Sequence, residues 1–380
     1  MGKGRVINTD LDFIRTIKKA GGDDLKKCYQ CATCATVCEL SPDSKPFPRK
    51  EMILAGWGQS DKLIGDPDIW LCYQCNDCAT YCPRGAKPGN VLAAIRSYIY
   101  EHYSFPSFMG KALASPKALP LLWAVPIVVI TALVLIFNGG DFSFVNDGKI
   151  VFSKFLSHFW IEIFFIPATH LVGLFALIGL YKYWKALEAT SPEKKMGFVP
   201  GAILVVKDIL THINFFSCDT NKSRGLMHLL IFFGFIGAAV TTGIGIFMMY
   251  ILHIDPPFSL MNHPVKWLGN ASAIAGILGC GYLIIRKAIE GDKVGATGYQ
   301  DWLFLIVMFA TFLTGFMAQM LRVADLAVLA YATYYVHLIV VFFLLIYAPY
   351  SKFAHMLYRT VALIHAKCAG RESVSCASSN

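Results

Sequence analysis

Eight of the twelve cysteines in the chain fall in two short runs that have the same spacing. The runs are Cys28-x2-Cys31-x2-Cys34-x3-Cys38 and Cys72-x2-Cys75-x2-Cys78-x3-Cys82-Pro83. Given twice, this spacing is typical of proteins that hold two 4Fe–4S clusters, because three thiolates on one tight loop bind three corners of a cubane. Structural zinc sites favour separated pairs of cysteines instead, so two complete runs argue against zinc.

The fourth cysteine of each run predicts how the two clusters share their ligands. It follows a longer gap, points away from its own loop and binds the cluster of the other run. One predicted cluster therefore has the ligands Cys28, Cys31, Cys34 and Cys82. The other predicted cluster has the ligands Cys72, Cys75, Cys78 and Cys38.

Four of the ten histidines could ligate haem iron. A histidine inside a membrane helix is costly and is a functional candidate for that reason. His337 and His355 are 18 residues apart, which is five helical turns. On one helix they would therefore lie on the same face, about 27 Å from one another along the axis. This is the arrangement expected of a helix that gives one ligand to each of two stacked haems, although Pro349 between them could kink it.

Each haem then needs a second imidazole at a matching depth. His228 is the predicted partner of His355, and His170 is the predicted partner of His337, with His158 as the rival of His170. Two imidazoles suit a haem iron that only transfers electrons, because both axial positions are filled. The alternative for all four is a hydrogen-bonded polar contact inside a helix bundle. The remaining histidines are expected to be interfacial or loop residues and not ligands: His102, His212, His253, His263 and His365.

Six long apolar segments would position these histidines. They lie at about 119–137, 159–181, 226–252, 267–285, 302–321 and 328–350. Each is close to the ~20 residues that cross a hydrocarbon core of ~30 Å as a helix. The chain is 56% hydrophobic and only 16% charged, whereas soluble domains carry about 25% charged residues. Composition therefore excludes an ordinary soluble protein and predicts a multi-pass membrane protein.

Lysine and arginine are distributed unevenly between the loops. If the cysteine-rich part is cytoplasmic, the inside segments hold sixteen of these residues and the outside segments hold four. This asymmetry, with an N-terminus that lacks an apolar signal segment, predicts cytoplasmic termini and a cytoplasmic iron–sulfur domain. The same asymmetry explains the net charge of +9, because the excess Lys and Arg residues lie in the loops between the apolar segments, and it argues against nucleic-acid binding. Arg224, just before His228, is a candidate for binding haem propionates, or it is only one of these charges.

The predicted fold is mainly α, with a ferredoxin-like two-cluster iron–sulfur domain followed by a six-helix transmembrane haem b bundle. The expected boundaries are 1–104 for the iron–sulfur domain, 105–118 for a linker, 119–356 for the membrane domain and 357–380 for a cytoplasmic tail. A moderately apolar stretch within 197–216 predicts a half-buried interfacial helix rather than a further span.

Two parts of the chain resemble known families. The stretches CYQCATCATVCE and DIWLCYQCNDCATYCPRGAKP resemble the iron–sulfur (C) subunit of heterodisulfide reductases. The stretches RGLMHLLIFFGFIG and YYVHLIVVFFLLIYAPYSKFAHM, which carry His228, His337 and His355, resemble the haem b membrane subunit of heterodisulfide and respiratory nitrate reductases. That subunit has a second ligand on the third span where this chain has Ala238, so His170 would have to replace it.

The fusion of both modules resembles the membrane subunits of the quinone-interacting membrane-bound oxidoreductase (Qmo) complexes of sulfate reducers. The resemblance implies electron exchange between menaquinone and cytoplasmic flavin and iron–sulfur subunits, linked to adenylylsulfate (APS) reductase. The alternative within this class is a heterodisulfide-reductase-like or sulfite-pathway membrane subunit. We found no nucleophile or dinucleotide-binding motif, so we expect a subunit of a redox complex and not a complete enzyme. An ion pump would need several charges in mid-span and a sensor would need an output domain, and we expect neither.

Overall fold

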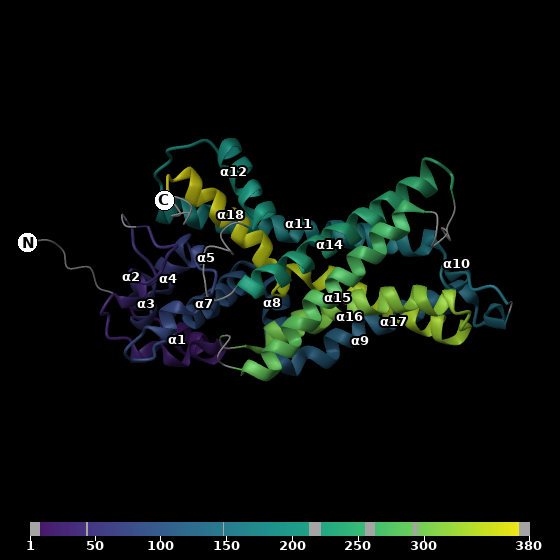
Figure 1. Ribbon diagram of the computed structural model, residues 1–380, viewed down its shortest axis with the longest axis horizontal. Helices are drawn as coiled ribbons and strands as arrows, with labels where there is room; N and C mark the ends of the chain where they lie inside the picture. Colours follow the sequence, from purple (N-terminus) through teal and green to yellow (C-terminus); the bar gives the residue numbers. More distant parts are fainter. Residues whose placement is uncertain are drawn as a thin grey trace, which may run out of the picture.

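The computed structural model describes residues 8–42, 45–146, 148–212, 222–254, 263–291, 295 and 297–371. None of these residues lies in a β-strand. Figure 1 shows short helices gathered at the N-terminal end and long helices that run away from them. The predicted fold class is confirmed, because a small cysteine-rich part is followed by six long apolar helices.

The cysteine-rich part is a set of short helices around two loops. Its helices are α1 (Leu11–Ile17), α2 (Thr33–Thr36), α3 (Arg49–Gly56), α4 (Ser60–Leu63), α5 (Asp68–Leu71), α6 (Asp77–Thr80) and α7 (Pro88–Tyr103). Asp10 caps α1, because its carboxylate accepts the Phe13 N–H at 2.8 Å. α7 is the longest of them, and Leu92, Ile95 and Ile99 along one of its faces are fully buried.

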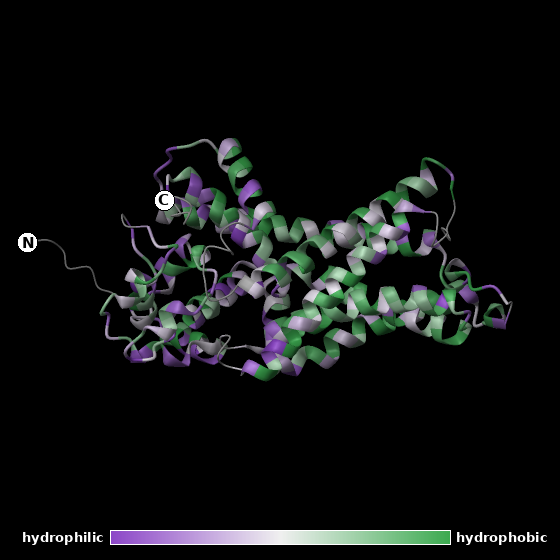
Figure 2. Ribbon diagram, in the orientation of Figure 1, coloured by the Kyte–Doolittle hydropathy of each residue, from purple (hydrophilic) through white to green (hydrophobic). Residues whose placement is uncertain are grey.

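Six of the described helices are long and apolar enough to cross a membrane. They are α9 (Leu119–Asn138), α11 (His158–Thr190), α14 (Lys222–Tyr250), α15 (Pro264–Glu290), α16 (Tyr299–Val323) and α17 (Ala327–Tyr347). Two short helices lie between the parts or the spans, namely α8 (Ser107–Ala114) and α10 (Phe152–Phe155). Figure 2 shows apolar residues along the whole length of the long helices. Leu121, Leu177 and Val328 are 70%, 63% and 69% exposed, as expected of side chains that face lipid.

The long helices contact one another in a consistent order. α14 packs on α15, α15 on α16, α16 on α17, and α17 on both α9 and α11. Small residues let α14 and α15 approach closely. A methyl group at Gly234 would lie 2.8 Å from the carbonyl oxygen of Ser272, and one at Gly279 would lie 2.7 Å from Ile231.

The helix that carries His337 ends before it reaches His355. α17 ends at Tyr347, a 3-10 turn covers Ala348–Tyr350, and a new helix, α18 (Ala354–Cys368), follows. Pro349 explains the break, because it has no N–H to donate and its ring clashes with the preceding turn of a helix. The expectation that His337 and His355 share one face of a single helix is therefore wrong.

α18 joins the cysteine-rich part to the membrane part. Its residues were expected mostly as a tail, but the helix contacts α5, α7, α11 and α12 (Phe198–Thr211). Tyr358 of α18 stacks on Trp70 of α5 with 6.4 Å between ring centroids, and Tyr183 of α11 lies against both rings. All three rings are buried, so the two parts share one hydrophobic core.

α12 has the form expected of the interfacial helix. Val205 packs against Ile364 and Cys368 of α18, whereas Phe198 and Ile203 are 56% and 64% exposed. An amphipathic helix of this kind presents its apolar outer face to the boundary of a bilayer. The part of the expected stretch that follows residue 212 lies outside the described residues.

Candidate metal centres

Two loops of the cysteine-rich part have the same backbone conformation. We call residues 28–34 loop 1 and residues 72–78 loop 2, and both begin with the sequence CYQC. The third and fifth residues have left-handed φ angles, 60° and 71° in loop 1 and 55° and 74° in loop 2. In both loops the N–H of the third residue donates to the sulfur of the first, at 3.4 Å in loop 1 and 3.3 Å in loop 2. The sequence repeat is therefore also a structural repeat.

The eight thiols of the two runs divide into two groups, and the charges of the thiolates within each group affect one another. One group is Cys28, Cys31, Cys34 and Cys82, and the other is Cys38, Cys72, Cys75 and Cys78. Burial, and then neighbouring thiolates of the same group, raise the pKa of the Cys34 thiol to about 11 and that of Cys38 to about 12. Each group contains three cysteines of one run and the fourth cysteine of the other, and the binding of one cluster by each group stays a prediction.

The sulfur atoms are too far apart to surround a single metal ion. Four thiolates that bind one zinc ion at about 2.3 Å lie about 3.8 Å from one another. All eight cysteines are among the described residues, and no three of their sulfur atoms lie within 4.8 Å of one another. Among the described residues, the eight thiols therefore form no three-thiolate site for a single ion.

Two arginines from the membrane part bind loop 2. Arg224 of α14 donates to the carbonyl oxygen of Gln74 at 2.8 Å, and Arg359 of α18 donates to that of Cys72 at 3.4 Å. The Arg359 guanidinium also lies 4.0 Å from the centre of the Tyr73 ring. Loop 2 is therefore fixed against the ends of the spans.

Loop 1 has equivalent contacts from its own domain. Arg49 of α3 donates to the carbonyl oxygen of Gln30 at 3.0 Å, and Arg84 lies 4.1 Å from the centre of the Tyr29 ring. Tyr29 is 68% exposed and Cys31 is also exposed. Loop 1 therefore faces away from the membrane part.

A cavity of about 520 Å³ lies between loop 2 and the neighbouring ends of the spans, which we call the near end of the bundle. His212, His228, His355 and apolar side chains such as Phe235 line it. Its cationic lining residues are Lys19, Arg96, Arg224, Arg286, Lys287, Lys352 and Arg359. Its acidic lining residues are Glu101, Asp208 and Asp301. Seven cations against three carboxylates suit a ligand with an apolar body and anionic substituents.

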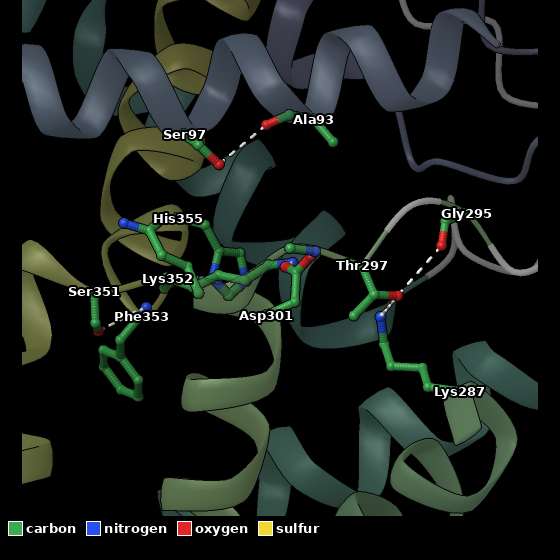
Figure 3. Close-up of polar contacts among 12 residues, drawn as sticks. Ala93, Ser97, Lys287, Gly295, Thr297, Asp301, Ser351, Lys352, Phe353 and His355 are labelled. Atoms are coloured by element: carbon green, nitrogen blue, oxygen red, sulfur yellow. Dashed lines mark hydrogen bonds and ion pairs between the residues drawn. The ribbon is translucent and has the colours of Figure 1, made fainter. Parts of the chain in front are cut away.

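Figure 3 shows part of the charged wall of this cavity. Lys352 forms an ion pair with Asp301 of α16 beside His355, and Lys287 of α15 donates to the Thr297 hydroxyl at 3.1 Å. Arg359 has a buried Nη2 that finds no acceptor among the described residues. A carboxylate in the cavity would satisfy it.

Two of the four predicted haem ligands donate a hydrogen bond from Nδ1 to a backbone carbonyl. His170 donates to Ile166 at 2.7 Å, and His355 donates to Lys352. A carbonyl oxygen can only accept, so both rings carry a proton on Nδ1. In a neutral ring Nε2 then has the lone pair that can bind iron.

The other two predicted ligands bond to side chains. Nδ1 of His337 lies 2.9 Å from the hydroxyl of Thr314, and Nδ1 of His228 lies 3.0 Å from Nε2 of His212. α16 needs a glycine beside His337, because a methyl group at Gly315 would lie 2.9 Å from the ring.

The structure brings the near-end pair of histidines to one site. His228 and His355 both line the cavity. No contact between the rings of His170 and His337 occurs among the residues that the structure describes, and His170 is exposed. His158 is the half-buried first residue of α11. The far-end pairing, and the choice between His170 and His158, stay predictions.

Sequence reasoning missed several residues of this site. Arg359 lies four residues after His355, so helical spacing could have placed it on the same face. His212 was expected to be an interfacial or loop residue and not a ligand, and no spacing rule predicts its contact with His228. Arg224 lines the cavity, but its hydrogen bonds go to loop 2, so its binding of a propionate stays a prediction.

Comparisons with known proteins divide the chain in the same way. The family model of the 4Fe–4S dicluster domain matches residues 24–86, and that of citrate utilization protein B matches residues 110–376. The chain is 25% identical over 205 residues to the E subunit of the dihydromethanophenazine:CoB–CoM heterodisulfide reductase of Methanosarcina thermophila. This match covers 50% of the chain and 74% of that relative. No solved structure matches the chain.

Two further relatives are shorter matches to the cysteine-rich part. The C subunit of the H2:CoB–CoM heterodisulfide,ferredoxin reductase of Methanothermobacter thermautotrophicus is 38% identical over 91 residues, or 24% of this chain and 49% of that protein. An Archaeoglobus profundus protein, described as similar to the C subunit of heterodisulfide reductase, is 36% identical over 100 residues, or 26% and 53%. The chain thus spans about half the length of these two relatives. The resemblance to a fusion of a heterodisulfide-reductase-like iron–sulfur domain with a membrane domain is confirmed.

Proposed function

Because the chain belongs to the citrate utilization protein B family and carries a 4Fe–4S dicluster domain before that region, we propose that it is the membrane electron-transfer subunit of a quinone-linked oxidoreductase complex. The complex exchanges electrons between menaquinone and cytoplasmic flavin and iron–sulfur subunits. In our proposal it is of the Qmo type and is linked to APS reductase in sulfate respiration. Two 4Fe–4S clusters and two b haems supply one-electron transfer when bound.

The cavity at the near end of the bundle carries this proposal. Three imidazoles line it, and two of them, those of His228 and His355, together with an apolar wall and an excess of cations, match the iron, the ring and the propionates of a haem. Arg224 and Arg359 hold loop 2 against the same cavity, so a cluster on that loop would lie beside the haem. Arg224, Arg359 and Lys352 are the candidates for binding propionates.

The groups of side chains described above support the two cluster sets and the near-end haem set, and the far-end pair rests on the sequence. We assign the cluster near the membrane to Cys38, Cys72, Cys75 and Cys78, and the distant cluster to Cys28, Cys31, Cys34 and Cys82. We assign the near-end haem to His228 and His355, and the far-end haem to His170 and His337. Loop 1 is exposed and would give the partner subunits access to the distant cluster.

The similarity to heterodisulfide reductase subunits favours a second candidate. In it, the chain is the membrane subunit of a heterodisulfide-reductase-like or sulfite-pathway complex. The same residues would bind the same cofactors, and only the partner subunits and the final acceptor would differ.

Purification of the complex in a mild detergent tests the proposal. We expect co-purifying flavin and iron–sulfur subunits, two haems per chain and about eight non-haem irons per chain. A complex without haem would refute the proposal. Partner subunits of the heterodisulfide reductase type, without association with APS reductase, would select the second candidate.

A reporter fusion after Asn380 tests the orientation in the cell membrane. The excess of basic residues in the inside segments predicts cytoplasmic termini and a cytoplasmic iron–sulfur domain. The fusion should be active with a cytoplasmic reporter and inactive with alkaline phosphatase. The opposite pattern would place loop 1 and its partner subunits outside the cell.

A further inference from the structure

We infer that His212 is a positioning residue that fixes the proton and the orientation of the His228 ring and lowers the reduction potential of the near-end haem. This inference rests on the proposed function, which places a haem on His228 and His355. It assigns a role to a residue that sequence reasoning regarded as interfacial.

The contact between the two rings is close and enclosed. Nε2 of His212 lies 3.0 Å from Nδ1 of His228, and the ring centroids are 5.1 Å apart. The ring of Phe232 packs edge-on against His212 at 5.0 Å. His212 is only 5% exposed, so the hydrogen bond is shielded from water.

The backbone around His212 places its ring at this position. His212 directly follows α12 and has a φ angle of 51°, in the left-handed region that few residues with a side chain adopt. α12 packs on α18 through Val205, Ile364 and Cys368, and α18 carries His355. One pair of packed helices therefore positions both His212 and the second imidazole of the site.

Iron ligation decides which ring donates. If Nε2 of His228 binds iron, the only ring proton of His228 is on Nδ1. His228 must then donate to Nε2 of His212, which accepts. The reverse arrangement would put the proton on Nε2 of His228 and would block ligation.

The identity of the acceptor predicts the effect on the potential. An acceptor at Nδ1 makes the ligating imidazole more basic, which favours ferric over ferrous iron. Backbone carbonyls play this part for His170 and His355, and the Thr314 hydroxyl lies at Nδ1 of His337. His228 is the one predicted ligand whose acceptor can be removed without altering the backbone or the far-end site.

Two substitutions in the purified complex separate hydrogen bonding from packing. His212→Phe keeps a ring against Phe232 and removes the acceptor, whereas His212→Gln keeps an acceptor oxygen. We expect an optical redox titration of His212→Phe to show both haems, with one midpoint potential raised. A tenfold change in the ferrous-to-ferric ratio would appear as about 59 mV. His212→Gln should restore most of the parental value, and His102→Gln, outside the cavity, should leave both potentials unchanged.

The haem count and the potentials decide the outcome. Loss of one haem in His212→Phe with its retention in His212→Gln also supports the inference. Loss of a haem in both variants would identify His212 as an iron ligand and would overturn the positioning role. Two haems with unchanged potentials in both variants would overturn it as well. A parent complex without haem would instead overturn the proposed function, so the two failures can be distinguished.

Discussion

Loop 1 and loop 2 have the same local structure but opposite surroundings. The carbonyl oxygen of the third residue accepts from an arginine in both, from Arg49 in loop 1 and from Arg224 in loop 2. The tyrosine that follows the first cysteine lies under an arginine in both, under Arg84 and under Arg359. In loop 1 these arginines come from the same domain and the surface is open, whereas in loop 2 they come from α14 and α18. The repeat therefore determines how each loop folds, and the source of the arginines determines which loop meets the membrane part.

The largest effect that this comparison predicts is the loss of a whole cluster. Cys38→Ser should damage the cluster of loop 2, although Cys38 belongs to the first run, and Cys28→Ser should damage the cluster of loop 1. Low-temperature EPR of the two reduced variants should therefore show different missing signals. If both substitutions removed the same signal, the crossover would be wrong and each loop would hold its own four ligands.

The second prediction compares the haem beside loop 2 with the far-end haem. His228→Ala should remove the haem next to loop 2 and leave the spectrum of the far-end haem, because His228 lines the near-end cavity. His170→Ala should do the converse. A pyridine haemochrome assay gives the count, which should fall from two haems to one in each variant. Two haems in His170→Ala would transfer the far-end role to His158 or to another residue.

A smaller effect should separate Arg224 from Arg49, which make matched hydrogen bonds. Arg224 lines the cavity, whereas Arg49 is exposed and its charge is screened by water and salt. Arg224→Gln should lower the potential of the loop 2 cluster by roughly 60 mV, or tenfold in the equilibrium ratio, because a nearby cation favours the reduced cluster. Arg49→Gln should shift the loop 1 cluster by less than half as much in an EPR-monitored redox titration. Equal shifts would mean that the different surroundings of the two loops do not affect their electrostatics.

The smallest expected effect concerns an ion network in which Lys50 of α3 meets three buried carboxylates, Glu51, Asp66 and Asp68. α3 carries Arg49, which binds loop 1, and Lys50, which lies 2.8 Å from Asp66 and 3.0 Å from Asp68, just before loop 2. Glu51 of the same helix is fully buried, and burial, followed by the charge of Asp66, raises the pKa of its carboxyl from 4.5 to about 8.

The raised pKa of Glu51 predicts the direction of a pH dependence. The folded state keeps a proton that the unfolded chain loses above pH 4.5, so the stability of this region should fall as the pH rises to about 8. Glu51→Gln should flatten that slope, while the exposed Asp12→Asn should not. Thermal loss of cluster absorbance, measured from about pH 5 to about pH 9, gives the slope. A steep slope that persists in Glu51→Gln would assign the dependence to other groups.

Local patterns predicted most of what the structure shows. The grouping of the cysteines follows from their spacing, because the ligand loops are tight and close in sequence. The six spans follow from apolar length alone. Pro349 was visible in the sequence as a possible kink, but only the structure shows that it ends α17 and separates His337 from His355.

The remaining features depend on packing between distant segments. The Trp70–Tyr358 stack joins two helices from opposite ends of the chain, and the His212–His228 hydrogen bond joins the end of α12 to α14. Neither contact leaves a periodic signal in one chain. The second arginine of loop 2 comes from residue 359, a region expected as a tail, so composition could not distinguish it from a solvent-exposed basic residue.

The position of α18 has a consequence for the order in which the protein is made. During translation both cysteine runs emerge long before Tyr358 and Arg359, which cover Trp70 and bind loop 2. Until then, the side of the cysteine-rich part that will face the bilayer remains open, even if α1, α3 and α7 have already packed. Delivery of iron and sulfide to loop 2 therefore has a period during translation in which the site is accessible, and the packing of α18 closes it.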